Sequence, residues 1–284
     1  MTRSITLQCP SKVNLFLDIT AKRANGYHEI STLFLPIDQI TDTLVISEIN
    51  SGMSIACHHP GVPCDEKNLI WKVAQAFADR VKIKASWHFD LIKRIQVAGG
   101  MAGGSSNAAS TLIGLNELYD YPLSKLELAE IAVQYGADIP FFFEKSPARA
   151  EGIGEVLEPV SIQQDLYLLF IPFSFPISAV WAYKNRLGGF NSAPMNLDET
   201  LAQLNEGKTP QIYNNLAPAV RHKFPVIDLA CKQLIDKGAL TAEVSGSGPT
   251  VFALFKSAEK RNRALSELQA NFPEILIAAD YKAL

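Results

Sequence analysis

The sequence has little of what marks secreted, membrane-embedded or nucleic-acid-binding proteins. Only four of its 284 residues are cysteine, and their spacing lacks the pairing of a disulfide scaffold. The formal net charge of −3 is small and has the wrong sign for a general nucleic-acid binder. The most apolar stretch, residues 166–183, contains two prolines, which is atypical of a membrane-spanning helix. The first residues lack a secretion signal's charged-then-apolar pattern, so we expect a cytoplasmic protein without membrane or nucleic-acid partners.

One short segment, which contains Cys57, His58, His59 and Cys64, has the residue types of a zinc site. Adjacent histidines rarely reach one tetrahedral ion, and no second cluster in the sequence completes a ligand set. We therefore predict a solvated loop and no resident metal, with zinc as the alternative.

The composition is that of an ordinary globular protein, with 48% hydrophobic and 19% charged residues. Alternating segments in the first fifty residues predict antiparallel strands, with a turn at Asn25-Gly26. Helical spacing follows Asn68, a good N-cap, and Ser124 with Glu127 forms a predicted capping box. The predicted strands are 4–9, 13–20, 31–35, 43–49, 89–97, 166–171, 243–245 and 250–255. The predicted helices are 69–81, about 105–118, 124 to about 136, 197–205 and 226–237.

These elements predict an α+β fold in which mixed or antiparallel sheets pack with helices. We place the domain boundary near Pro159, which gives domains of residues 1–158 and 159–284.

A glycine-rich segment between a predicted strand and a predicted helix carries the strongest chemical signal. Glycine lets the backbone come close to a phosphate, and the free N–H groups of the following helix attract an anion. The segment lacks the lysine of a P-loop and the glycine spacing of a dinucleotide-binding fingerprint. We predict phosphate binding here, with a flexible turn as the alternative. Its residues are Gly99, Gly100, Met101, Ala102, Gly103, Gly104, Ser105 and Ser106.

Three segments, in order along the chain, resemble the motifs of the GHMP kinase superfamily, named for galactokinase, homoserine kinase, mevalonate kinase and phosphomevalonate kinase. They are Pro-Ser-Lys-Val-Asn-Leu-Phe-Leu at 10–17, the glycine segment within 97–109, and Ser-Gly-Ser-Gly-Pro-Thr-Val-Phe at 245–252. Gly-Tyr-His-Glu at 26–29 and Gly-Ala-Asp-Ile-Pro at 136–140 resemble a branch of that superfamily with a cytidine-diphosphate-linked alcohol as substrate. The resemblance covers nearly the whole chain.

The resemblance implies a two-domain GHMP kinase fold with its active site in the interdomain cleft, and transfer of phosphate from ATP, with Mg²⁺ carried by the nucleotide. It implies that Asp138 is the catalytic base and that Lys12 is its cationic partner. Asn68 and Leu69 would join the glycine segment in binding ATP. The substrate-binding residues that it implies are Asn14, Tyr27, His28, Tyr183, Gly246 and Ser247.

Ordinary structural roles compete with these assignments. By residue type alone, Asp138 is typical of a turn and Lys12 of the surface at a strand edge. Tyr27 is typical of a partly buried tyrosine in a hairpin. Two rival functions also remain, a sibling kinase acting on mevalonate or homoserine and a catalytically silent nucleotide-binding relative. Both a monomer and a homodimer fit the sequence, and the segment from Tyr213 to Leu216 has no assigned role.

Overall fold

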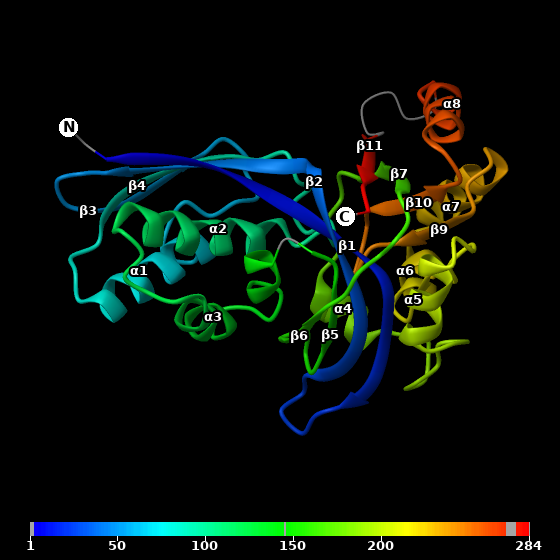
Figure 1. The fold of residues 1–284 in the computed structure, drawn as a ribbon, viewed down its shortest axis with the longest axis horizontal. Coiled ribbons are helices and arrows are strands. Elements are labelled where there is room, and N and C mark those ends of the chain that lie inside the picture. Colours follow the sequence, from blue (N-terminus) through cyan, green and yellow to red (C-terminus); the bar gives the residue numbers. More distant parts are fainter. Residues whose placement is uncertain (1–2, 145, 271–276, 284) are drawn as a thin grey trace. The chain divides into compact units, whose positions relative to one another are not determined.

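The computed structural model describes residues 3–144, 146–270 and 277–283 (Figure 1). Its strands are β1 Ser4–Lys22, β2 His28–Glu48, β3 Gly52–Cys57, β4 Ser86–Ile92, β5 Ala148–Glu151, β6 Val156–Pro159, β7 Leu166–Ile171, β8 Tyr213–Asn214, β9 Thr241–Val244, β10 Val251–Phe255 and β11 Ile277–Tyr281. Its helices are α1 Leu69–Val81, α2 Gly103–Leu118, α3 Lys125–Val133, the 3₁₀ turn η1 Pro140–Phe143, α4 Ala179–Lys184, α5 Leu197–Asn205, α6 Ala217–Lys223, α7 Pro225–Asp236 and α8 Ala258–Leu268.

These elements form two compact units whose segments alternate along the chain. Unit 1 consists of Met1–Ser11, Ile40–Val97 and Ala102–Lys145, and unit 2 of Lys12–Gln39, Ala98–Met101 and Ser146–Leu284. The long strands β1 and β2 each contribute residues to both units. The sequence-based boundary near Pro159 stays a prediction.

Unit 1 packs helices against strands around an apolar core. Strand β4 lies between β2, to which it is antiparallel, and β3, to which it is parallel. Helix α2 comes very close to the sheet, because a Cβ atom at Gly114 would lie 2.6 Å from Leu7 Cδ1 and 2.9 Å from Ile46 Cδ1. Helix α1 packs beside α2, and its Phe77 meets Trp87 of β4 edge to face. Glycine at position 114 therefore allows the close approach of α2 to β1 and β2.

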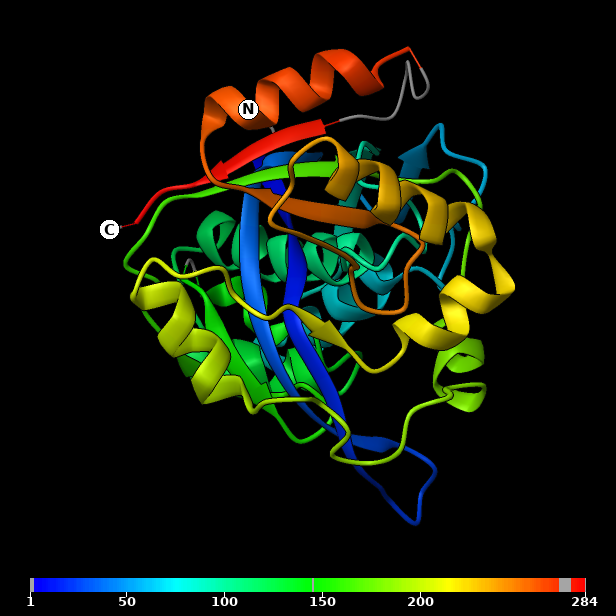
Figure 2. The ribbon, with the colours of Figure 1, turned by 90° about the vertical axis from the view of Figure 1, so that its right-hand side faces the viewer.

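Unit 2 contains an antiparallel sheet in the order β11-β7-β10-β9. Helix α7 packs on β9 and β10, and α8 packs on β7 and β10 (Figure 2). In the same unit β8 pairs with β1, and β5 pairs with β2 and β6. Every residue of β10 is buried, as expected for a strand in the middle of a sheet with helices packed on it.

Several elements match the sequence-based expectations and others differ. Helix α1 with its Asn68 cap, strand β7 and helix α5 have the predicted bounds. The strands predicted at 4–9 and 13–20 form one strand, β1, because proline's fixed φ is compatible with extended backbone at Pro10. Those predicted at 31–35 and 43–49 lie within the single strand β2 or extend one residue beyond it.

The strand predicted at 89–97 is observed as β4, which begins three residues earlier, at Ser86, and ends five residues earlier, at Ile92. The carboxylate of Asp42 accepts hydrogen bonds from the backbone N–H groups of Arg94 at 2.7 Å and Ile95 at 2.9 Å. Those amides therefore bind a side chain instead of a neighbouring strand. Helix α2 begins at Gly103, ahead of the predicted start at Ser105 or Ser106.

The four cysteines are free thiols. Burial raises the pKa of Cys9 to about 11 and that of Cys231 to about 12, so neither supplies a thiolate at neutral pH. Within the described residues no cluster of three or more His, Cys, Asp or Glu side chains is arranged to hold a metal ion. The same part of the chain contains no helix long and apolar enough to cross a bilayer.

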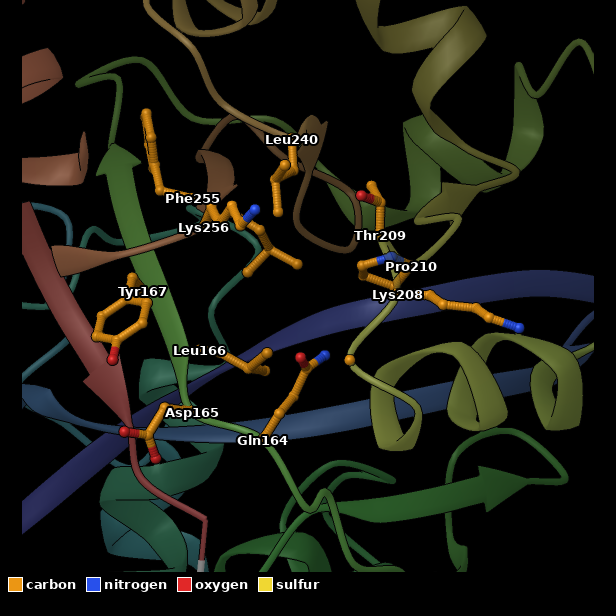
Figure 3. Close-up of a pocket in the computed structure, with 12 residues that line it drawn as sticks. Gln164, Asp165, Leu166, Tyr167, Lys208, Thr209, Pro210, Leu240, Phe255 and Lys256 are labelled. Carbon is orange, nitrogen blue, oxygen red and sulfur yellow. The ribbon is translucent and has the colours of Figure 1, made fainter. Parts of the chain in front are cut away.

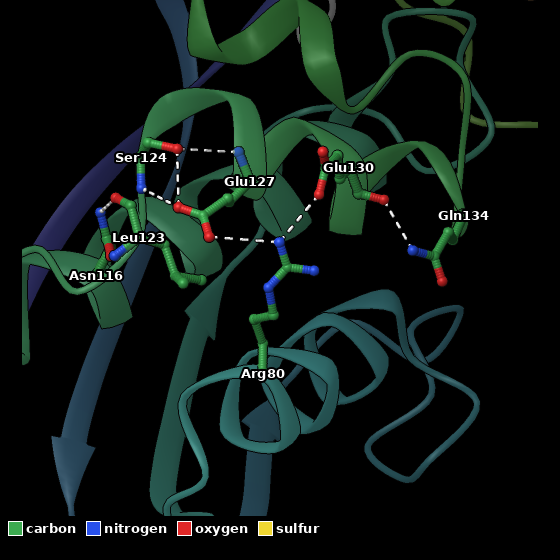
Figure 4. A network of polar contacts seen from close by, with 7 residues as sticks. All are labelled: Arg80, Asn116, Leu123, Ser124, Glu127, Glu130 and Gln134. Atoms are coloured by element: carbon green, nitrogen blue, oxygen red, sulfur yellow. Dashed lines mark hydrogen bonds and ion pairs between the residues drawn. The ribbon is translucent and has the colours of Figure 1, made fainter.

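Helix α3 begins with the predicted capping box (Figure 4). The Ser124 hydroxyl accepts a hydrogen bond from the Glu127 N–H, and the Glu127 carboxylate accepts one from the Ser124 N–H at 2.9 Å.

We predict that Ser124→Ala lowers the free energy of unfolding by about 1 kcal/mol, measured by urea denaturation. Ser51→Ala, in an exposed turn, is the control and should leave it unchanged. Equal stability of the two variants would contradict the capping role.

Candidate active site

The glycine segment begins in unit 2, where four consecutive carbonyl groups are each held by a hydrogen bond. The donors are the N–H of Ile177 to Ala98, the N–H of Thr250 to Gly99, the hydroxyl of Ser245 to Gly100 and the N–H of Lys12 to Met101. In a trans peptide the C=O and N–H groups point in opposite directions. The N–H groups of residues 99–102 are therefore turned away from these partners, as a backbone anion cradle requires.

Gly100 is the tightest point of this cradle. Its φ is +81°, and a Cβ atom there would lie 2.1 Å from the Ser245 carbonyl oxygen and 2.9 Å from the Gly248 nitrogen. Only glycine therefore fits without moving the backbone.

The remainder of the glycine segment belongs to unit 1 and starts helix α2. The first N–H groups of α2 have no carbonyl partner one turn earlier in the helix. They and the positive end of the helix dipole are therefore available to an anion. A Cβ at Gly103 would lie 2.9 Å from Ile95 Cγ2 and 3.0 Å from Lys93 Nζ. Ser105 is partly exposed, whereas Ser106 is buried and its hydroxyl has no hydrogen-bond partner among the described residues.

A buried polar cluster lies beneath this helix start and was missed by the sequence reasoning. Lys93 is ion-paired with Asp42, and Asn107 of α2 donates to the same carboxylate at 2.9 Å. Lys93 Nζ also donates to Asn107 Oδ1 at 3.2 Å. Asp42 thus joins the segment after β4 to the first turns of α2. No local pattern reveals the cluster, because Asp42 and Asn107 are 65 positions apart.

Asn68 and Leu69, which the resemblance assigns to nucleotide binding, also lie in unit 1, at the start of α1. Asn68 Oδ1 accepts from the Ile70 N–H at 2.9 Å, so the capping role predicted from the sequence is present. Leu69 is partly exposed, and its Cδ1 is 3.9 Å from a Cβ built at Gly104. The start of α1 therefore adjoins the glycine segment.

Asp138 lies in unit 1, in the turn between α3 and η1. It is partly buried, and the Ile139 and Pro140 that follow it are buried. The turn is closed by a hydrogen bond from the Ile139 N–H to the Gly136 carbonyl at 3.2 Å. The apolar residues after Asp138 therefore anchor the turn that carries its carboxylate.

Lys12 and Asn14 lie on β1 in unit 2 and are both buried. The Lys12 ammonium donates to Asn14 Oδ1 at 2.7 Å and lies 4.5 Å from the centroid of the Phe34 ring. Asn14 Nδ2 donates to the Thr32 hydroxyl at 2.8 Å, which fixes the amide orientation. Contacts on both sides thus hold the Lys12 cation, and a strand-edge surface position is ruled out by its 4% exposure.

The predicted cytidine-binding residues also lie in unit 2. The rings of His28 and Tyr183 stack with centroids 5.2 Å apart and an interplanar angle of 25°. Burial, and then the positive charges of Arg186 and Lys22, lower the pKa of His28 below its ordinary value of 6.5. Tyr27 is 59% exposed, which contradicts a partly buried hairpin tyrosine and leaves its ring free to stack on a ligand.

Gly246 and Ser247 lie in the turn between β9 and β10. A Cβ at Gly246 would lie 3.2 Å from the Gly100 carbonyl oxygen and 3.3 Å from Asn14 Oδ1. Ser247 is partly exposed in the same turn. Unit 2 therefore brings Lys12, Asn14, the start of the glycine segment and this turn together.

A hollow of about 360 Å³ occurs elsewhere in unit 2 (Figure 3). None of the predicted site residues lines it. Its lining residues are Gln164, Asp165, Leu166, Tyr167, Gly207, Lys208, Thr209, Pro210, Leu240, Leu254, Phe255 and Lys256.

A glycine segment and a buried lysine in unit 2 and a helix start in unit 1 are features that phosphoryl-transfer enzymes use to position and neutralise phosphate. The family model described as GHMP kinases N terminal domain matches residues 68–145, and GHMP kinases C terminal matches residues 197–274. The chain belongs to the GHMP kinase family.

Two curated relatives within this family carry the same name. The chain is 35% identical to the 4-diphosphocytidyl-2-C-methyl-D-erythritol kinase of Pelobacter propionicus, over 94% of this chain and 95% of the relative. It is 34% identical to the enzyme of that name from Geobacter metallireducens, over 94% of both chains. A solved structure of 4-(cytidine 5'-diphospho)-2C-methyl-D-erythritol kinase matches with TM-score 0.83 and 27% identity, over 97% of this chain and 98% of that one.

Homoserine kinase from Cytophaga hutchinsonii matches with TM-score 0.75 and 18% identity, over 99% of this chain and 94% of that one. That likeness concerns the fold. The α+β GHMP kinase fold expected from the sequence is confirmed.

We predict that Gly100→Ala weakens nucleotide binding at least tenfold, because the added methyl group meets the Ser245 carbonyl oxygen. Equilibrium binding of a fluorescent ATP analogue measures the loss. Gly52→Ala is the matched control, since Gly52 also has a positive φ of +74° but has no atom within 4 Å of its Cβ position. Affinity of Gly100→Ala equal to that of the control would contradict the cradle.

A second prediction concerns the His28 imidazole, which we expect to titrate below pH 6.5 in an NMR titration. Its pKa is depressed in the folded chain, so its contribution to stability is full above about pH 6.5 and is lost as the pH falls. Arg186→Gln removes one positive charge and should raise this pKa, whereas Arg186→Lys should leave it unchanged. A wild-type value at or above 6.5 would contradict the assignment.

Proposed function

We propose that the protein transfers the γ-phosphoryl group of ATP to the 2-hydroxyl of 4-diphosphocytidyl-2-C-methyl-D-erythritol, in the cytoplasm and in the non-mevalonate route to isoprenoid precursors. The observation that carries this proposal is similarity to enzymes of that name, at 35% identity over 94% of the chain.

The proposed donor site is the glycine segment. Amides of residues 99–102, turned away from the partners of the preceding carbonyls, and the amides at the start of α2 would supply donors for phosphate oxygens without any charged side chain. Asn68 and Leu69 would contact the adenine or its ribose, which agrees with the position of Leu69 beside Gly104.

The proposed acceptor site recognises the cytidine group. His28, held neutral by its lowered pKa, can donate from one ring nitrogen and accept at the other, as a pyrimidine edge requires. Tyr183 fixes the imidazole plane by stacking, and the exposed Tyr27 ring offers a face to the base. Asn14, Gly246 and Ser247 would contact the part of the substrate near Lys12.

The proposed chemistry uses one carboxylate and one cation. Asp138 would orient the acceptor hydroxyl and take its proton as the oxygen attacks the γ-phosphorus. Lys12 would offset negative charge on the transferred phosphoryl group, and its fixed contacts mean that little reorganisation is needed. The proposal requires that both residues act on one bound substrate.

Magnesium would enter with the nucleotide and neutralise charge on its phosphate oxygens. Ser105, partly exposed, and Ser106, with a buried hydroxyl that has no partner among the described residues, suit contact with the phosphates or the ion.

The test is ADP release from MgATP with the cytidine-linked alcohol, compared with mevalonate, homoserine and galactose. We predict turnover of the cytidine compound alone. Asp138→Asn should lower kcat about 10²- to 10⁴-fold while ATP binding is retained. The matched control is Asp90→Asn, which alters an exposed aspartate on β4 and should leave kcat unchanged.

The other outcomes separate the rival functions. Turnover of mevalonate or homoserine instead would establish a kinase with a different acceptor. ATP binding without turnover of any alcohol would establish a silent relative. Full activity of Asp138→Asn would overturn the assignment of the base but leave the substrate in place.

A further inference from the structure

The segment from Tyr213 to Leu216, for which the sequence suggested no role, contains the two-residue strand β8. Tyr213 pairs in parallel with Phe16 of β1, and the Asn215 N–H donates to the Leu17 carbonyl at 2.9 Å. The segment is thereby fixed to the strand that carries Lys12. Asn214 is 2% exposed and lies inside unit 2.

Among the described residues, the partners of the Asn214 carboxamide are all backbone groups. Its Nδ2 donates to the carbonyls of Val244 and Gly246, each at 2.8 Å, and its Oδ1 accepts from the Leu216 N–H at 2.9 Å. A side-chain amide has two donor hydrogens and one acceptor oxygen, so this environment satisfies the donors and engages the acceptor. Asn214 therefore clamps the start of the turn between β9 and β10.

The turn that Asn214 clamps also holds the glycine segment. The Ser245 hydroxyl donates to the Gly100 carbonyl at 2.9 Å, and the Thr250 N–H donates to the Gly99 carbonyl at 3.1 Å. The turn is closed on itself by the Ser245 N–H, which donates to the Thr250 carbonyl at 2.9 Å. Two of the four carbonyls that orient the cradle thus depend on the turn that Asn214 fixes.

We infer that Asn214 is a positioning residue for nucleotide binding, which sets the direction of the amides at Gly100 and Met101 through the turn at Val244–Thr250. The inference rests on the proposed donor site. Asn214 is buried and its carboxamide bonds backbone groups of unit 2, so it would act through Ser245 and Thr250 and not by contact with the nucleotide.

Asparagine is required because both targets of Nδ2 are carbonyl oxygens. Aspartate has the same shape, but its ionised carboxylate only accepts hydrogen bonds and would face two other acceptors. Asn214→Asp should therefore shift the turn, and misplacement on the scale of 1 Å lowers the rate of a positioned reaction by about 10²-fold.

The experiment compares Asn214→Asp with Asn116→Asp in the complete enzyme. Asn116 is a buried asparagine of α2 whose carboxamide also bonds only backbone, donating to the Leu123 carbonyl at 2.9 Å and accepting from its N–H at 3.0 Å (Figure 4). Both variants should lose stability. Only Asn214→Asp should lower kcat/KM for ATP, by about 10²-fold, and weaken binding of a fluorescent ATP analogue. Binding of cytidine 5'-diphosphate, which probes the His28 site, should change less than twofold.

A double-mutant cycle with Ser245→Ala tests the route of the effect. If Asn214 acts through Ser245, the two losses in ATP binding are not additive. Additive losses, or equal loss of ATP binding in Asn116→Asp, would assign Asn214 a structural role only. If Asn214→Asp does not fold, Asn214→Ala replaces it in the same comparison, because it removes the donor without adding charge.

This test does not depend on the acceptor. A wild-type protein that binds the ATP analogue but does not turn over the cytidine compound would defeat the proposed substrate and still report on Asn214. If the wild-type protein turns over the cytidine compound and Asn214→Asp binds the ATP analogue as tightly as wild type, the inference is defeated and the proposed function stays intact.

Discussion

The planar trans peptide links the direction of each carbonyl to that of the following N–H, and the candidate nucleotide site depends on this constraint. The carbonyls of Ala98 to Met101 accept bonds from three separate parts of unit 2, which are β1, the segment before α4, and the turn between β9 and β10. Elements distant in sequence thus set the direction of a few amides. A site built in this way would hold phosphate with dipoles that are already oriented, so little reorganisation would accompany binding.

The part of the glycine segment in unit 1 is held by a buried polar cluster. There the Asp42 carboxylate accepts from Lys93, from Asn107 and from two backbone amides. A buried ion pair is costly unless its remaining hydrogen-bonding capacity is filled, and here additional donors surround the carboxylate. The cluster joins the segment after β4 to α2, so one aspartate determines where the strand ends and how the helix start is held.

The sequence predicted the elements that local chemistry determines. Asn68 and Ser124 are recognisable caps, and β7 is an apolar run with a clear end. The motif residues were found by resemblance, and the positions of His28 and Tyr183 agree with one shared role, although the site assignments themselves stay predictions. Asp42 and Asn214 were not identified, because their partners are 65 and 32 positions away and no periodicity reports such contacts. The same holds for Arg186, whose effect on His28 arises only from folded proximity.

The two long strands near the N-terminus have a consequence for dissecting the molecule. The core of unit 2 includes Leu17 and Ile19 of β1 and Ile30 of β2 together with residues from β7 onward. A fragment that starts after residue 158 would therefore lack part of its own core, and the fragment ending there would carry those apolar residues without their partners. Complementation of separately expressed halves would have to rebuild β1 and β2 as intermolecular strands, so the enzyme should behave in such experiments as one cooperative chain.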